Sequence, residues 1–274
     1  MADMYIKVNG KTIYTEFTHI KDLKTAFSCG KPTKKTITIV DGFQSDENYP
    51  LREGMEVTFI HKGAMPPVDV LESMMCARHT PKVHEKVKQA HVAIAGLGGL
   101  GSNIAISLAR TGVGYLHLID FDEVEPSNLN RQQYKISHLG MPKTQALKQE
   151  IEEINPYIHV TTHNTRVDDD NIKKLFVQDG IICEAFDKPE AKAMLVNGIL
   201  EHFPEKYIVA ASGMAGYQSS NHIQTRKITS HFYLCGDETS NAEPGNGLMA
   251  PRVTICAGHQ ANMVLRIILQ ETEP

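Results

Sequence analysis

The chain has 274 residues and a net charge of -4, with 41% hydrophobic and 22% charged residues. This is enough for one or two domains with a full core, and the mild acidity argues against a nucleic-acid-binding protein, whose surface is normally basic. No apolar run has membrane-spanning length, and the N-terminus lacks a signal-peptide pattern. The five cysteines are scattered and do not form a disulfide framework. We therefore expect a cytoplasmic protein that does not bind membranes.

Residues 1–64 predict a small β-grasp domain. Asn9-Gly10 separates two alternating segments, which is typical of a hairpin. The expected elements are strands at 4–8 and 12–17, a helix at 19–29, and strands at 35–40 and 55–60. This order is that of ubiquitin and of the sulfur carrier ThiS, and the segment Leu51 to Val57 resembles the end of ThiS-type proteins.

That carrier family ends in a free Gly-Gly carboxylate, whereas this chain continues through Lys62-Gly63-Ala64-Met65. The domain therefore has no carboxylate to activate at that point. Two roles stay open for it: a docking or dimerisation module, and an appendage that only adds stability. We expect residues 65–90 to be a linker with short helices, because Pro66-Pro67 favours an extended backbone before an amphipathic stretch at 68–75.

Residues 91–122 predict a nucleotide-binding strand, loop, helix and strand. A buried strand at 91–95 precedes Gly96-Leu97-Gly98-Gly99-Leu100-Gly101, and a helix at 102–111 follows. In such a loop Gly96 permits a tight turn, Gly98 lets the backbone approach a phosphate, and Gly101 lets the helix pack closely. Asp120, after a second strand at 115–119, lies near the spacing at which a carboxylate meets a ribose.

The residues after Asp120-Phe121-Asp122 favour a nucleoside triphosphate over a dinucleotide. A dinucleotide is held largely by backbone amides, whereas cleavage of a triphosphate needs fixed cations such as Arg131 and Lys143. Lys143 lies in the first turn of a helix predicted at 142–154. The helix dipole disfavours a cation at this position, so its presence there needs an explanation. A triphosphate in front of that helix provides one.

The remaining segments predict a Rossmann-like α/β domain over 91–274 with a mainly parallel sheet. The expected strands are 159–165, 180–185, 207–213, 221–228 and 231–235, and the expected helices are 168–177, 191–203 and 251–269. The polar, glycine-containing segment 236–247 is expected to be a mobile loop that holds a substrate over the nucleotide.

Five motifs in this order resemble the ThiF/MoeB family, the bacterial relatives of ubiquitin-activating enzymes. They are Gly-Leu-Gly-Gly-Leu-Gly-Ser, Asp-Phe-Asp, Ser-Asn-Leu-Asn-Arg-Gln, Gly-x-Pro-Lys and the later Asp187. The resemblance covers roughly 74–274 and is strongest to the ThiF form with an extra N-terminal domain. It implies a homodimer that uses ATP and Mg²⁺ to adenylate the C-terminal glycine of a ThiS-like sulfur carrier protein in thiamine biosynthesis.

The resemblance also implies roles for individual residues. Arg131 and Lys143 would contact the triphosphate, Arg78 would reach it across the dimer, and Asp187 would hold the magnesium. The remaining nucleotide-binding residues would be Gly96, Gly98, Gly99, Gly101, Asn103, Asp120, Asp122, Asn128 and Gln132. The usual Asp-Cys-Thr-Asp motif is Glu184-Ala185-Phe186-Asp187 here, so Glu184 is a weaker second carboxylate.

The cysteines depart from the family pattern. Many members bind zinc through two Cys-x-x-Cys pairs, and this chain has none, although its histidines leave an unrelated site open. Some relatives also form a covalent adduct with the carrier through a cysteine. Cys235 is the better candidate for that role here and Cys256 the weaker, whereas Cys183 is expected in the core.

Three other functions stay open. The chain could adenylate a threonylcarbamoyl group on tRNA, as a relative in the superfamily does, although the carrier-like domain and the acidic charge argue against it. A nicotinamide-dependent oxidoreductase would share the glycine loop but would not need Asn128, Arg131 and Lys143. A non-catalytic scaffold that docks a carrier is the third.

Overall fold

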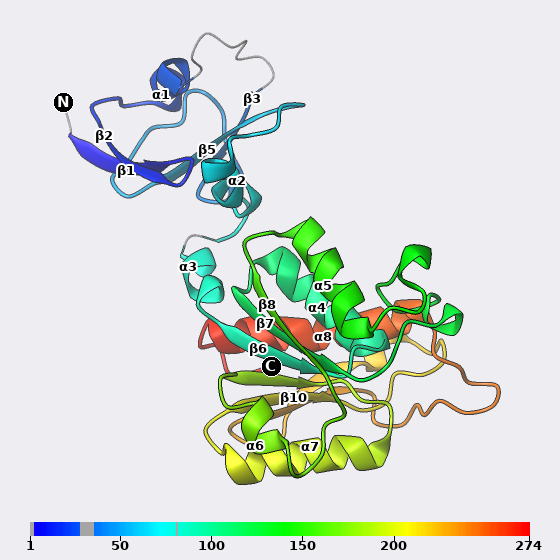
Figure 1. Cartoon of the computed structure of the whole chain (residues 1–274). Coiled ribbons are helices and arrows are strands. Elements are labelled where there is room, and N and C mark those ends of the chain that lie inside the picture. The colour runs from blue at the N-terminus through cyan, green and yellow to red at the C-terminus, as the bar shows by residue number, and fades with distance from the viewer. Residues whose placement is uncertain (1–2, 28–35, 81) are drawn as a thin grey trace. The chain divides into compact units, whose positions relative to one another are not determined.

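The computed structural model describes residues 3–27, 36–80 and 82–274 (Figure 1). The chain forms two compact units, Met1–Glu85 and Lys86–Pro274. Each unit has its own hydrophobic core. Within the described residues, every helix is too short or too polar to cross a bilayer.

The first unit is the expected β-grasp domain. Its sheet has the order β2-β1-β5-β3-β4, with β1 and β5 parallel at the centre. The elements are β1 (Met4–Val8), β2 (Lys11–Thr15), α1 (Ile20–Phe27), β3 (Thr36–Val40), β4 (Phe43–Gln44) and β5 (Glu56–His61). Asn9 (φ 49°) and Gly10 (φ 80°) form the predicted hairpin turn. Residues 28, 29 and 35 of the predicted helix and strand lie outside the described residues.

Alternating side chains build the core of this unit. Ile6 and Val57 on neighbouring strands pack with Leu23 of α1 and are almost fully buried. Two short helices follow, α2 (Val68–Met75) and α3 (Val83–Lys88). α2 packs against β5, and Lys11 Nζ contacts Asp69 Oδ2 at 2.6 Å. The predicted linker therefore begins with a helix that belongs to the first unit.

The second unit is a doubly wound sheet of the order β11-β12-β10-β9-β6-β7-β8, parallel except for β11. Its strands are β6 (His91–Ala95), β7 (Tyr115–Asp120), β8 (His159–Asn164), β9 (Ile181–Glu184), β10 (Tyr207–Ala211), β11 (Gln224–Lys227) and β12 (Phe232–Gly236). The chain order reverses at β6, which has β7 on one side and β9 on the other. Open α/β sheets bind ligands at the carboxyl ends of strands at such a switch point.

Helices cover both faces of this sheet (Figure 1). They are α4 (Gly99–Thr111), α5 (Lys143–Ile154) and α8 (Ala250–Ile268) on one face, and α6 (Ile172–Leu175) and α7 (Pro189–His202) on the other. The core under α6 and α7 includes Phe176, Leu195 and Ile199. The fold class predicted from the sequence is confirmed in both units.

Candidate functional site

At two positions of the glycine loop after β6, neighbouring backbone atoms leave no space for a side chain. Gly96 has φ 88°, and a Cβ there would lie 2.8 Å from the carbonyl oxygen of Ala185. A Cβ on Gly101 would overlap the carbonyl oxygen of Gly96, so the first turn of α4 packs directly on the loop. These are the tight turn and the close packing that the sequence predicts for Gly96 and Gly101.

Gly98 differs because the protein leaves space beside it. A Cβ there would have a single neighbour within 4 Å, Gln132 Nε2 at 3.9 Å. Gly98 is also the N-cap of α4, and no side chain caps that end. Unsatisfied backbone N–H groups at a helix N-terminus favour an anion, so this open space suits a phosphate.

Asp120 braces the loop from the end of β7. Its Oδ2 accepts a hydrogen bond from the N–H of Leu97 at 2.6 Å, and its Oδ1 accepts one from the N–H of Asp122 at 2.8 Å. The hydroxyl of Tyr134 donates to the carbonyl of Leu97 at 2.8 Å. A carboxylate has about four acceptor sites, so Asp120 retains acceptor capacity for a ribose while it fixes the loop.

The two expected cations, Arg131 and Lys143, come from the segment after β7. Lys143 is buried, with 6% of its surface exposed, and its Nζ lies 2.9 Å from Oδ2 of Asp122. Arg131 Nη1 donates to the side-chain oxygen of Asn130 at 2.7 Å. Its Nε is buried, with no hydrogen-bond partner among the described residues. A buried polar group without a hydrogen-bond partner is costly in a native structure, so Arg131 Nε is suited to donate a hydrogen bond to a ligand.

The predicted amide side chains are of two kinds: two form hydrogen bonds to the protein backbone, and one has an oxygen without a partner among the described residues. Asn103 Nδ2 donates to the carbonyls of Gly99 at 2.7 Å and Arg131 at 3.1 Å, so its amide joins α4 to the Arg131 segment. Asn128 Oδ1 accepts from the N–H of Glu125 at 3.0 Å. Gln132 Oε1 is buried without a hydrogen-bond partner in the described structure, which again leaves a group for a ligand.

Asp187 lies at the same edge of the sheet as the glycine loop. It is exposed and follows β9, which pairs with β6 through Glu184 and Ala95. The backbone just before it, at Ala185, is the surface that a Cβ on Gly96 would strike. Lys188, not Asp187, is the N-cap of α7. The structure therefore leaves the Asp187 carboxylate at the switch point for another role.

Glu184 is not an open second carboxylate. Its side chain is fully buried, both its oxygens lie 3.1 Å from Lys192 Nζ, and Oε1 accepts the N–H of Phe186 at 2.7 Å. Burial raises the pKa of Glu184 even though Lys192 and the N–H of Phe186 act in the opposite direction. The expectation that Glu184 assists at the ligand site is wrong for this reason.

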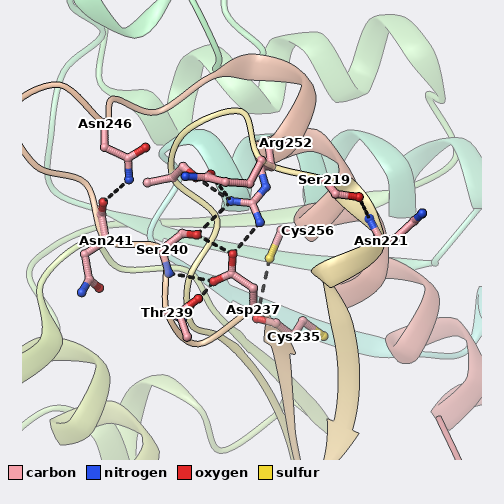
Figure 2. Close-up of polar contacts among 12 residues, drawn as sticks. Ser219, Asn221, Cys235, Asp237, Thr239, Ser240, Asn241, Asn246, Arg252 and Cys256 are labelled. Carbon is pink, nitrogen blue, oxygen red and sulfur yellow. Dashed lines mark hydrogen bonds and ion pairs between the residues drawn. The ribbon is translucent and has the colours of Figure 1, made fainter.

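The candidate cysteines are inaccessible. Cys235 and Cys256 are fully buried, and Cys256 Sγ lies 3.6 Å from the carbonyl oxygen of Cys235 (Figure 2). Burial raises the pKa of Cys235 to about 11 and that of Cys256 to about 12. Burial also raises the pKa of Cys183. Because the thiolate is the nucleophile, neither Cys235 nor Cys256 is suited to a covalent adduct in this conformation.

An ion pair that the sequence analysis missed anchors the segment expected to be mobile. Arg252, in the first turn of α8, contacts Asp237 Oδ2 at 2.5 Å (Figure 2). Its Nη1 also donates to the carbonyl of Ala215 at 2.6 Å. Asp237 also accepts from the hydroxyl of Ser240 at 2.5 Å. The sequence contains a signal for this ion pair, because Arg252, like Lys143, is a cation in the first turn of a helix, where the helix dipole disfavours it. The start of segment 236–247 is therefore fixed to α8.

Comparisons with known proteins agree with this geometry. The model of the ThiF family matches residues 71–274, and that of the ThiS-like ubiquitin family matches residues 4–63. The molybdopterin-synthase adenylyltransferase of Salmonella typhimurium is 30% identical over 196 residues, which are 69% of this chain and 77% of that protein. The tRNA threonylcarbamoyladenosine dehydratase of Escherichia coli is 37% identical over 109 residues, 39% of this chain and 41% of that protein.

A solved structure supports the fold. The Escherichia coli tRNA N6-threonylcarbamoyladenosine dehydratase in complex with ATP matches with a TM-score of 0.67 and 21% identity, over 76% of this chain and 98% of that one. The family model covers the sheet, the glycine loop and every residue placed around them above. With its motifs, its doubly wound sheet and this match in agreement, the chain belongs to the ThiF family.

Proposed function

We propose that this protein is an adenylyltransferase that uses ATP to adenylate the C-terminal glycine carboxylate of a ThiS-like sulfur carrier. The observation that carries the proposal is the open space at Gly98, which Gln132 Nε2 borders, with the Arg131 side chain 3.6 Å from where a Cβ on Gly99 would lie. Arg131 Nε and Gln132 Oε1 are buried without a hydrogen-bond partner among the described residues. Backbone N–H groups and fixed cations at one place are what a triphosphate requires. A relative whose solved structure holds ATP has the same fold.

The chemistry needs alignment and charge more than proton transfer. The carrier carboxylate is ionised at neutral pH, so no general base is required. Its oxygen forms a bond to the α-phosphorus, the bond from that phosphorus to the bridging oxygen breaks, and pyrophosphate leaves. Lys143 and Arg131 stabilise the charge that develops on the leaving group. Asp122 holds Lys143 in place, and Asp120 keeps the glycine loop and the ribose in register.

Asp187 is the residue we propose as the magnesium ligand. It is an exposed carboxylate at the edge where the glycine loop lies, and magnesium is commonly held by one or two carboxylates together with substrate phosphates. When bound, the ion would neutralise phosphate charge. Asp187 itself would fix the position of the ion relative to Arg131 and Lys143.

The proposed substrate is a separate polypeptide, because the chain's own β-grasp domain continues past Gly63. We propose a carrier of thiamine thiazole biosynthesis in the cytoplasm, and the carrier of molybdopterin synthase is the alternative suggested by a relative's name. We also propose a homodimer in which Arg78, which is exposed, contributes to the neighbour's site.

A second candidate function is adenylation of a threonylcarbamoyl group on tRNA. It is favoured by the fold match to the tRNA dehydratase, which spans 98% of that chain. The net charge of -4 and the carrier-like domain disfavour it, because tRNA binding normally needs a basic surface. A non-catalytic scaffold that docks a carrier remains the third function to be tested.

The test is ATP–pyrophosphate exchange with Mg²⁺ and a ThiS-type carrier ending in Gly-Gly. A carrier without its last glycine and a modified tRNA serve as alternative substrates, and Asp187→Ala is compared with Asp169→Ala, an exposed acid outside the site. We expect exchange to require the terminal glycine and to fall about 100-fold or more in Asp187→Ala alone.

Each other outcome selects a different function. Exchange with tRNA alone would favour the tRNA reaction. If the protein binds ATP but catalyses no exchange with any Gly-Gly carrier or tRNA, the adenylation proposal is wrong. The non-catalytic scaffold is then the remaining function.

A further inference from the structure

Three side chains with metal-ligating chemistry meet in the first unit, whereas the nucleotide site belongs to the second. They are Cys76, at the end of α2, His79, in the turn that follows, and His84, in α3. One candidate ligand atom from each lies within 4.8 Å of the other two. Cys76 Sγ and His84 Nδ1 are 3.1 Å apart.

The backbone holds these residues in place. Cys76 is the C-cap of α2, and the N–H of His79 donates to its carbonyl at 2.8 Å, which closes a turn. A Cβ on Gly42 would lie 2.8 Å from the carbonyl oxygen of His79, so this turn packs closely on the loop between β3 and β4. Lys7 of β1 contacts Glu85 at 3.1 Å and so connects the start of α3 to the same sheet.

One further contact is typical of a metal-binding histidine, and one nitrogen of the cluster has no partner among the described residues. His84 directs Nδ1 toward Cys76, while its Nε2 lies 3.5 Å from Oε1 of Glu72. A carboxylate on the far nitrogen orients a ligating imidazole and selects its tautomer. His79 Nδ1 is buried without a hydrogen-bond partner among the described residues. The cluster therefore contains an imidazole nitrogen that no described protein group satisfies.

The cluster borders a cavity. The cavity has a volume of about 230 Å³ and is lined by all three residues together with Glu72, Lys7 and Lys82. The three side chains are half-buried, so an ion has an entry path from solvent. One face of the cluster is therefore open to water or to another ligand.

We infer that Cys76, His79 and His84 form a zinc-type metal site, with a fourth coordination position that faces this cavity. One thiolate and two imidazoles are a ligand set that zinc prefers, and the spacings Cys-x₂-His and His-x₄-His fall in the range of known zinc sites. Tetrahedral zinc separates such ligand atoms by about 3.3–3.6 Å. The distance between Cys76 Sγ and His84 Nδ1 is within a few tenths of an ångström of that value.

Binding at this site has a structural consequence for the proposed function. Arg78 lies between the ligands Cys76 and His79 in sequence. A bound ion would join α2, the turn and α3 and would restrict the backbone that carries Arg78. Binding would also release the thiol proton of Cys76, so affinity falls at low pH.

Cobalt(II) titration of the full-length, chelator-treated protein tests the inference. We expect one equivalent to bind with a thiolate-to-cobalt charge-transfer band and the visible bands of a tetrahedral ion, and zinc to displace it. Cys76→Ser should abolish the charge-transfer band, and His79→Gln and His84→Gln should weaken binding by about tenfold or more. Glu72→Gln should weaken it about tenfold. His19→Gln, an exposed histidine of the same unit, is the control and should bind normally.

A second measurement does not depend on the variants folding. Among the described cysteines, Cys76 is half-buried while Cys183, Cys235 and Cys256 are buried. Zinc should therefore slow alkylation of Cys76 in the unaltered protein, as followed by peptide mass spectrometry. Alkylation of Cys76 that zinc leaves unchanged, or a cobalt spectrum without a thiolate band, would overturn the inference. Neither readout depends on the adenylation reaction.

Discussion

Gly98 and Gly101 of the nucleotide loop are required for different reasons. A Cβ on Gly101 would overlap the carbonyl oxygen of Gly96, whereas a Cβ on Gly98 would meet only the end of the Gln132 side chain. The first glycine leaves space for a ligand and the second permits the packing of α4. The two functions can be separated by one methyl group at each position.

We expect Gly101→Ala to lower the free energy of unfolding by about 1–3 kcal/mol, because the methyl group forces α4 away from the loop. Gly98→Ala should lower that free energy by only about 0.5–1 kcal/mol, because alanine is a poorer N-cap for α4 than glycine. It should weaken ATP binding by about 10- to 100-fold, because the methyl group occupies the phosphate space. Chemical denaturation and ATP titration of both variants make the comparison. Normal ATP affinity in Gly98→Ala would contradict the placement of the phosphates.

Residue types were easier to predict than residue environments. The sequence identifies Lys143, Asp120 and the glycines because a spacing motif connects them. It does not show that Cys235 is buried or that Cys76 faces two histidines, since both facts depend on how distant segments pack. The spacing of Cys76, His79 and His84 is a usable signal for the second case, although it differs from the Cys-x-x-Cys pattern of the family's zinc sites.

At the scale of elements, the ion pair between Asp237 and Arg252 fixes the loop after β12 to α8. Burial opposes ionisation of Asp237, but hydrogen bonds from Ser240, Thr239 and Arg252 outweigh it and hold the pKa of the carboxyl well below its usual range. A carboxylate with a lowered pKa stabilises the folded state above the pKa of the unfolded chain, about 4, and that stabilisation is lost as the pH falls through the folded-state pKa.

Asp237→Asn should therefore lower the free energy of unfolding by about 3–5 kcal/mol at pH 7, because Arg252 stays buried without its counter-charge. The difference from the unaltered protein should shrink as the pH falls below about 4, where the carboxylate of the unfolded chain begins to be protonated while that of the folded protein stays ionised. Denaturation curves across this range measure it, with the exposed Glu243→Gln as control. A difference that is constant with pH would show that the charge of Asp237 is not responsible.

Long periodic elements were predicted well and short ones were not. Strands β6, β7, β9, β10 and β12 each contain an apolar run, so the sequence predicts their positions to within about two residues. β11, with the sequence Gln-Thr-Arg-Lys, has no such run and begins three residues later than predicted. β4 has two residues and carries no periodic signal. The helix predicted at 168–177 is only Ile172–Leu175, because Asp168 Oδ1 accepts the N–H groups of Asp170 and Asn171 and makes a local turn instead.

At the scale of the whole molecule, each site of the proposed dimer contains groups from both subunits. If Arg78 acts on the neighbour's triphosphate, Arg78→Ala and Asp187→Ala remove groups that belong to different subunits of one site. Two inactive variants, once mixed, unfolded and refolded together, should then recover about a quarter of the unaltered exchange rate, because half the dimers are mixed and each has one intact site. Recovery at background level, with a dimer shown by hydrodynamic mass, would place Arg78 in its own subunit's site.

The continuation of the chain after Gly63 has a kinetic consequence. The first unit has the fold of a carrier, but its backbone continues from β5 toward α2, so it lacks the reactive end that the proposed reaction consumes. In the proposed reaction this unit would be retained unchanged through every turnover, and each ATP spent would require a fresh carrier molecule from solution. The initial rate should be first order in carrier at low concentration and vanish when only enzyme and ATP are present.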